Sequence, residues 1–98
     1  MNRDDILAIL RHRQAELTRM GVRHAALFGS VARGDDRPDS DVDVMIEVNS
    51  AVVRGIFAIG HIQQSIQDWI GRPVDLARRD RLRPGVAREA EQDAVDAF

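Results

Sequence analysis

The sequence contains no cysteine, no lysine and no tyrosine, and aromatic residues make up only 4% of its 98 residues. Without cysteine the chain can form no disulfide, no thiolate zinc site and no cysteine nucleophile. Without lysine it has neither the phosphate-binding lysine of a P-loop nor a lysine for Schiff-base chemistry. Since all 14 basic residues are arginine, the side-chain groups available for catalysis are hydroxyl, carboxylate, imidazole and guanidinium groups.

Long apolar runs are also missing. No run approaches the ~20 residues that a membrane-spanning helix requires, and the polar, acidic N-terminus is not followed by an apolar segment of the signal-peptide type. We therefore expect a cytoplasmic protein with no membrane association. The net charge of −2 argues against direct nucleic-acid binding, which usually needs a strongly basic surface.

The chain length predicts one small domain over residues 1–98. A domain of this size buries roughly two-thirds of the surface that its unfolded chain exposes, which is enough for one core. Hydrophobic residues make up 44% and charged residues 31% of the chain, as in ordinary globular proteins. No region remains for a second domain that would hold a large substrate.

Hydrophobic periodicity predicts alternating helices and strands. A first helix begins after a cap at Asn2 and runs to about Met20, where Gly21 ends it. The clearest strand covers residues 41–48, in which apolar and polar residues alternate. The other predicted elements are a strand at 24–28, a helical turn at 31–33, a loop at 34–40, a helix at 51–70, a strand at 74–77, a helix at 81–93, and at 94–98 either a short closing strand or a frayed end. This order predicts an α/β (α+β) fold, with a small mixed sheet flanked by helices.

The helix predicted at 51–70 has a cap at Asn49 or Ser50, and Gly71 ends it. Its apolar stripe, which we expect to face the core, consists of Val52, Ile56, Ile59, Ile62 or Gln63, Ile66, Trp69 and Ile70.

The first candidate site is Gly29-Ser30, where a predicted strand enters a helical turn. Glycine allows the backbone to approach a ligand closely, and the N–H groups at a helix start favour an anion such as phosphate. The Ser30 hydroxyl can reach a phosphate oxygen. Taken alone, the pair is also compatible with an ordinary turn.

Two carboxylates on the clearest strand form the second candidate site. Asp41 and Asp43 are two residues apart, so they point to the same face with Cα atoms about 6–7 Å apart. Like charges gathered in this way are costly unless a cation or a proton lies between them. Hard oxygen ligands of this kind suit Mg²⁺, which keeps several waters and binds substrate phosphates. The alternative is a solvated acidic face on an edge strand.

Asp75 stands near the start of the third predicted strand. If that strand lies beside the second, Asp75 completes a set of three carboxylates, which is suited to phosphoryl transfer with two metal ions. Taken alone, Asp75 is an ordinary polar residue at a strand start.

Together these segments resemble the signature of the polymerase-β-like nucleotidyltransferase superfamily. The signature is a hydrophobic residue, then Gly-Gly or Gly-Ser, about ten residues, and an alternation of acid and hydrophobe, as in Phe28-Gly29-Ser30 and Asp41-Val42-Asp43-Val44. Within the superfamily the chain resembles the minimal nucleotidyltransferases, the MntA-like antitoxin group. The Gly-Ser-x-Ala-Arg-Gly and Ser-Asp-x-Asp forms, the Gly-Arg-Pro-Val-Asp-Leu segment and the short length carry this resemblance, which spans nearly the whole chain.

The resemblance implies roles for individual residues. It implies that Gly29 and Ser30 bind the triphosphate of ATP and that Asp41, Asp43 and Asp75 are the catalytic carboxylates that bind two Mg²⁺ ions. Arg33 and Ser40 match the motif as further nucleotide-binding candidates. For Arg33, pairing with acidic loop residues is the favoured alternative to a phosphate contact, and Ser40 is expected to cap or shape the loop before Asp41.

The resemblance also implies a partner. Minimal nucleotidyltransferases are generally encoded beside HEPN-domain toxins, which are ribonucleases, and the implied function is an antitoxin that transfers AMP from ATP to a tyrosine of the toxin, within a homo- or hetero-oligomer. The absence of tyrosine fits an acceptor on another molecule. Two alternatives stay open: an antitoxin that neutralises its partner by binding alone, and a small-molecule nucleotidyltransferase of the antibiotic-modifying type.

Other polar residues have less specific interpretations. We expect Glu47 to be solvated, although it continues the face of Asp41 and Asp43, and Trp69 to lie in the core. The histidines, which have no metal-ligand spacing, are His12, His24 and His61. The arginines around the third strand, interpreted as a solvated charged loop or as a triphosphate or partner contact, are Arg72, Arg78, Arg79, Arg81 and Arg83.

Overall fold

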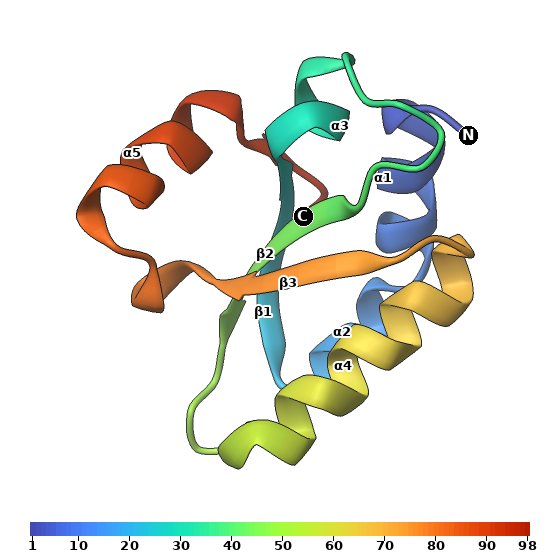
Figure 1. The fold of residues 1–98 in the computed structure, drawn as a ribbon. Coiled ribbons are helices and arrows are strands. Elements are labelled where there is room, and N and C mark those ends of the chain that lie inside the picture. The colour runs from blue at the N-terminus through green and yellow to red at the C-terminus, as the bar shows by residue number, and fades with distance from the viewer.

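A four-stranded mixed sheet forms the centre of the computed structural model, which describes all residues, 1–98 (Figure 1). The strands are β1 (Val22–Phe28), β2 (Val42–Val48), β3 (Val74–Arg78) and β4 (Val95–Asp96), in the spatial order β3-β2-β1-β4. β2 is antiparallel to β1 and parallel to β3, and β4 is antiparallel to β1. The predicted α/β (α+β) fold with a small mixed sheet is confirmed, and residues 95–96 form the closing strand.

Helices cover both faces of the sheet. They are α1 (Arg3–His12), α2 (Gln14–Arg19), α3 (Gly29–Arg33), α4 (Gly55–Ile70) and α5 (Pro84–Asp93), with a 3₁₀ turn η1 (Arg79–Arg81) between β3 and α5. Figure 1 shows α1, α2 and α4 on one side of the sheet and α5 on the other. None of these helices combines the length and hydropathy that a membrane span requires.

The N-terminal helical segment is two helices, so the prediction of one helix from the cap at Asn2 to about Met20 is wrong. Asn2 does cap its start, because the Asn2 side chain accepts a hydrogen bond from the Asp5 amide at 2.9 Å. The break lies at Arg13, which has φ −96° and ψ 11°. Its guanidinium pairs with Glu16 at 2.6 Å and lies 5.0 Å from the centroid of the Trp69 ring. Trp69 is accordingly only partly buried.

The helix α4 begins at Gly55, four residues later than predicted. Asn49 caps a turn and not the helix: its side chain accepts from the Ala51 amide at 3.0 Å, and its carbonyl accepts from the amides of Val52 and Val53. Such local bonds by asparagine compete with helix formation. As a result Val53 is buried, whereas Val52 lies on the surface.

The main core lies between the sheet and the helices α1, α2 and α4. It comprises 18 buried residues, among them Val42, Val44 and Ile46 of β2 and Ile62 and Ile66 of α4. On the opposite face, where α5 packs on the sheet, only Ala26 and Met45 of the sheet and Ala90 of α5 are fully buried. The sheet thus has one thickly covered face and one thinly covered face.

Candidate active site

The turn at Gly29 lies against the carboxylate of Asp43. β1 ends at Phe28, α3 begins at Gly29, and Phe28 is the strand residue directly opposite Asp43. Gly29 has φ +70°, and a Cβ atom at this position would overlap the Oδ2 atom of Asp43. Only glycine fits both the backbone conformation and the space. No side chain caps the start of α3, so its first N–H groups are left for water or a ligand.

Asp43 and Asp75 are direct neighbours on parallel strands. Asp43 of β2 is in register with Asp75 of β3, and neighbouring strands lie about 4.8 Å apart. Asp41 immediately precedes β2, two residues before Asp43. The third predicted strand does therefore lie beside the second, which was the condition for bringing the three carboxylates together.

The three carboxylates interact electrostatically. Burial raises the pKa of Asp43 above its ordinary value of 3.8, and repulsion by Asp75 and then by Asp41 raises it further, against a smaller opposing effect of Arg33. Asp43 is half-buried, whereas Asp41 and Asp75 are exposed. A carboxylate held in a like-charged, partly desolvated place favours a proton or a cation nearby.

The acidic cluster lies at the end of the sheet that α3 borders, on the face that α5 covers. Met45 and Ala77 of the small cluster under α5 follow Asp43 and Asp75 by two residues, so all four share one face. No group of three or more acidic or histidine side chains is arranged to hold a metal ion by itself. The carboxylates of Asp41, Asp43 and Asp75, beside the turn at Gly29, nevertheless fit a hard divalent cation that takes further ligands from water and phosphate.

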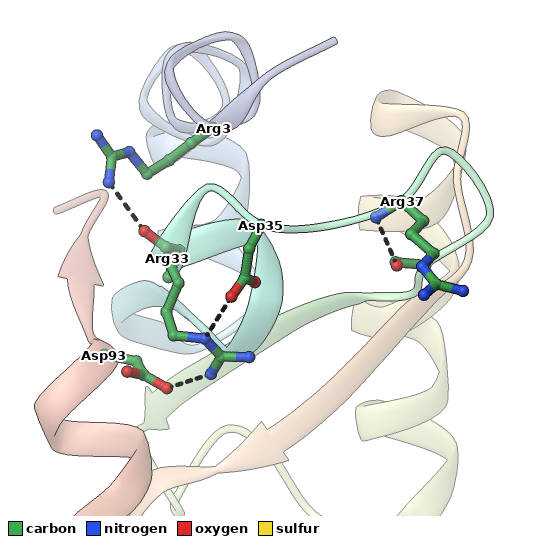
Figure 2. Close-up of polar contacts among 7 residues, drawn as sticks. Arg3, Arg33, Asp35, Arg37 and Asp93 are labelled. Atoms are coloured by element: carbon green, nitrogen blue, oxygen red, sulfur yellow. Dashed lines mark hydrogen bonds and ion pairs between the residues drawn. The ribbon is translucent and has the colours of Figure 1, made fainter.

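Arg33 lies in an ion-pair network and not free at the acidic cluster. Its Nε atom donates to Asp35 at 3.2 Å, and its NH1 atom donates to Asp93 of α5 at 2.7 Å (Figure 2). These hydrogen bonds, first that to Asp93 and then that to Asp35, raise the pKa of Arg33. The pairing with an acidic loop residue is the alternative that the sequence favoured, and the link to α5 was not foreseen.

Ser40 shapes the loop before Asp41, as expected. Its Oγ atom accepts from the Arg37 amide at 2.9 Å (Figure 2), and its own amide donates to the Arg37 carbonyl at 2.9 Å. These two bonds close a tight turn directly before Asp41.

Arg72 was named in the sequence only as one of several arginines around the third strand, and its role in holding the loop before Asp41 was not foreseen. Its NH2 atom donates to the Ser40 carbonyl at 2.8 Å and to Asp36 at 3.3 Å, and only 15% of its side chain is exposed. For this arginine the interpretation as part of a solvated loop is wrong. The position of Arg72 just before β3 could have indicated this role. Because β3 runs parallel to β2, the start of β3 lies next to the loop that precedes Asp41.

The interpretation of Glu47 on the same face also needs correction. Glu47 is not merely solvated, since it lies 3.6 Å from Arg79 and 3.9 Å from His24. Arg79 also donates from Nε to Glu91 of α5 at 2.6 Å. This network lies at the opposite end of β2 from Asp43.

The fold is that of a minimal nucleotidyltransferase. Residues 5–97 match the family model described as Nucleotidyltransferase domain, and the chain therefore belongs to this family.

Individual members of this family and solved structures also resemble the chain. Over 93 residues the chain is 29% identical to the protein adenylyltransferase MntA of Thermococcus cleftensis, covering 94% of this chain and 92% of that protein. The solved structure of a minimal nucleotidyltransferase superimposes with a TM-score of 0.81 at 24% identity, covering 97% and 95% of the two chains. A chain in the structure of a tri-AMPylated Shewanella oneidensis HEPN toxin with MNT antitoxin gives a TM-score of 0.65 at 15% identity, over 94% and 71%. At these identities the two structural matches show the shared fold.

Proposed function

We propose that this chain is a Mg²⁺-dependent protein adenylyltransferase that transfers AMP from ATP to a tyrosine of a HEPN-family partner toxin and acts as its antitoxin. The observation that carries the proposal is the register of Asp43 and Asp75 on neighbouring strands, with Gly29 packed against Asp43. The name of the MntA relative and the AMPylated toxin in the complex of similar fold support AMP as the transferred group and a HEPN protein as acceptor.

The proposed reaction is a substitution at the α-phosphorus of ATP. The tyrosine oxygen forms a bond to the α-phosphorus, the bond from that phosphorus to the bridging oxygen of the β-phosphate breaks, and pyrophosphate leaves. The hydroxyl proton passes to Asp75. Two Mg²⁺ ions bound by Asp41, Asp43 and Asp75 would neutralise the triphosphate and lower the pKa of the attacking hydroxyl.

The other motif residues position the nucleotide. The backbone at Gly29 and the Ser30 hydroxyl bind the triphosphate, and the absence of a side-chain cap on α3 leaves its first N–H groups available for this purpose. Arg33 and Ser40 act mainly by holding the turn and the loop on either side of the nucleotide, since both are engaged in protein contacts. The single domain 1–98 works in the cytoplasm, and the acceptor comes from the partner chain.

Mass measurement of the partner tests this proposal. The chain is incubated with ATP, Mg²⁺ and the HEPN protein encoded next to it, and the intact toxin is then weighed and its modified peptide is mapped. We expect a mass increase of one or more AMP units on tyrosine, which EDTA or the double substitution Asp41→Ala/Asp43→Ala abolishes. Asp39→Asn, in an exposed loop position, is the matched control that leaves transfer intact. If the toxin stays unmodified and the double variant still neutralises it fully, the enzymatic proposal is wrong and the chain is an antitoxin that acts by binding alone.

A further inference from the structure

Exposed apolar side chains gather around the start of α4. Five large hydrophobic residues of the chain are exposed, and three of them lie within residues 52–57: Val52, Ile56 and Phe57, at 54%, 81% and 89% exposure. Single exposed apolar residues are normal on protein surfaces, whereas a contiguous group marks an interaction site. Ile56 was expected to lie on the buried stripe of the helix, yet its side chain and that of the neighbouring Phe57 lie almost fully in solvent.

A cationic hollow adjoins one of these side chains, that of Ile56. It has a volume of about 410 Å³ and is lined by Gly55, Ile56, Ile59, Arg78 and Arg81. The Nε atom of Arg78 is buried without a hydrogen-bond partner, and the same side chain makes one contact with Asp80, at 3.4 Å. Arg81 forms no ion pair, and neither does Arg54 immediately before the helix. The surface is therefore apolar and positively charged in a chain whose net charge is −2.

This surface lies at the opposite end of the sheet from the acidic cluster. β2 runs from the end bordered by α3 to the end where α4 starts (Figure 1). A molecule bound at the start of α4 would leave Gly29, Asp43 and Asp75 accessible. The surface is thus suited to holding a partner without blocking the carboxylates.

We infer that this surface, the α4 docking patch formed by Val52, Arg54, Ile56, Phe57, Arg78 and Arg81, binds an acidic amphipathic segment of the partner toxin. An apolar side chain of that segment enters the hollow beside Ile56 and Ile59, and its carboxylates pair with Arg78 and Arg81. The inference rests on the proposed function for the identity of the partner. It adds the place where the partner is held.

Charge complementarity favours this occupant over two others. A second copy of the chain would have to supply a segment that is both acidic and apolar. In α5, the helix with the most acidic residues, Glu91 is paired with Arg79 and Asp93 with Arg33, and the acidic loop 35–41 carries no large apolar side chain. A nucleic acid would need a surface dominated by basic and polar groups, whereas Ile56 and Phe57 dominate this one. A protein segment that alternates acidic and apolar residues satisfies both kinds of group on the patch.

Binding measurements with matched variants test the inference. The purified chain is titrated with the HEPN protein encoded next to it. Ile56→Ser/Phe57→Ser is expected to weaken binding by at least about 100-fold, since each side chain loses its burial at the interface. Both residues are exposed, so thermal unfolding should be unchanged. The control Val86→Ser, at a side chain that is 48% exposed on α5, should bind like the wild type.

A second variant tests the contribution of the arginines in the α4 docking patch. Arg54→Glu/Arg81→Glu should slow association by about tenfold and reduce its dependence on salt, because charges at an interface act mainly on the association rate. Arg19→Glu, an exposed arginine on α2 without an ion pair, is the control that should leave the rate within about threefold.

The outcomes separate this inference from the proposed function. Normal toxin binding by the Ile56→Ser/Phe57→Ser variant would overturn the docking patch while leaving AMP transfer untouched. Loss of self-association in sedimentation, with toxin binding intact, would instead assign the patch to contacts between copies and also overturn the inference. Loss of toxin binding by this variant, together with a wild-type chain that binds the toxin but transfers no AMP, would support the patch and overturn the proposed enzymatic function.

Discussion

The carboxylate of Asp43 occupies the space that a Cβ atom at position 29 would take. The glycine of the Gly-Ser motif is therefore required by the acidic residue fourteen positions later, as well as by its own backbone conformation. The two halves of the signature are in physical contact and form one unit of the site.

A pair of glycine substitutions separates these two requirements. Gly29 and Gly34 have φ +70° and +77°, but nothing lies within 4 Å of a Cβ at Gly34. Each Gly→Ala change should cost about 1–2 kcal/mol of unfolding free energy through left-handed strain. Only Gly29→Ala should also displace Asp43 and reduce AMP transfer by more than about 100-fold, through loss of positioned catalytic groups. Urea unfolding and the toxin mass assay measure the two effects, and equal activity losses in both variants would contradict the contact argument.

The raised pKa of Asp43 predicts that ionisation of this carboxyl lowers the free energy of unfolding of the metal-free protein. The folded state favours the protonated carboxyl, so the stabilisation from this proton is complete below the ordinary value of 3.8 and is lost as the pH rises through the raised pKa. In EDTA, Asp43→Asn should therefore unfold at a higher temperature than the wild type at pH 7, and this gain should disappear below 3.8.

Asp39→Asn controls for the loss of one negative charge, because Asp39 is exposed in the loop. Mg²⁺ with ATP should stabilise the wild type and not Asp43→Asn, since a ligand that binds only the folded state raises its stability. A lower melting temperature of Asp43→Asn at pH 7 would show that burial and repulsion do not dominate at this position.

The sequence alone could predict the acidic site because its signals are local. The alternation of Val42, Asp43 and Val44 set the strand and its two faces, and Gly29 marked the turn. Asp43 and Asp75 can lie together only if β3 lies beside β2. The sequence did not establish this arrangement and the prediction was conditional on it; the register of the two strands confirms it.

The errors occur where individual contacts, some of them local, override the apolar periodicity. Leu10 and Leu17 are seven residues apart, as on a continuous helix, so the break at Arg13 cannot be derived from apolar spacing. It coincides with contacts to Glu16 and Trp69. Similarly, Ile56 fits the helical stripe but lies in solvent, because α4 begins only at Gly55 and extends past the core at this end.

Arg72 should control activity through the loop before Asp41. Arg72→Ala removes the donors to the Ser40 carbonyl and to Asp36, and charge-assisted bonds of this kind contribute about 1.5–3 kcal/mol. We expect a loss of unfolding free energy in this range and an AMP transfer rate reduced by more than about tenfold because the carboxylate of Asp41 is misplaced. Toxin affinity should stay unchanged.

Two comparisons sharpen this prediction. Arg72→Lys should not restore activity, since an ammonium group lacks the planar fork of donors. Arg37→Ala is the matched control in the same loop, because the hydrogen bonds of Arg37 involve its backbone and not its side chain. Full transfer activity in Arg72→Ala at a temperature where it is folded would refute the positioning role.

The helix α5 should be the first element to open. Only Ala90 of this helix is fully buried, and its attachment depends on the pairs Arg79–Glu91 and Arg33–Asp93. Since exposed ion pairs contribute about 0–1 kcal/mol, Arg79→Gln should accelerate amide exchange in α5 by up to about fivefold and leave β1 and β2 protected. Arg88→Gln, on the same helix and outside every ion pair, is the control.

The effect of Arg79→Gln should depend on pH in a defined direction. The hydrogen bond from Arg79 lowers the pKa of Glu91 from its ordinary value of 4.5, so this pair stabilises the attached helix above 4.5 and ceases to do so as the pH falls through the lowered pKa. Protection factors of α5 in wild type and variant should therefore differ at pH 7 and converge in acid. A difference that persists in acid would mean that Arg79 holds α5 through its contact with the sheet and not through the carboxylate of Glu91.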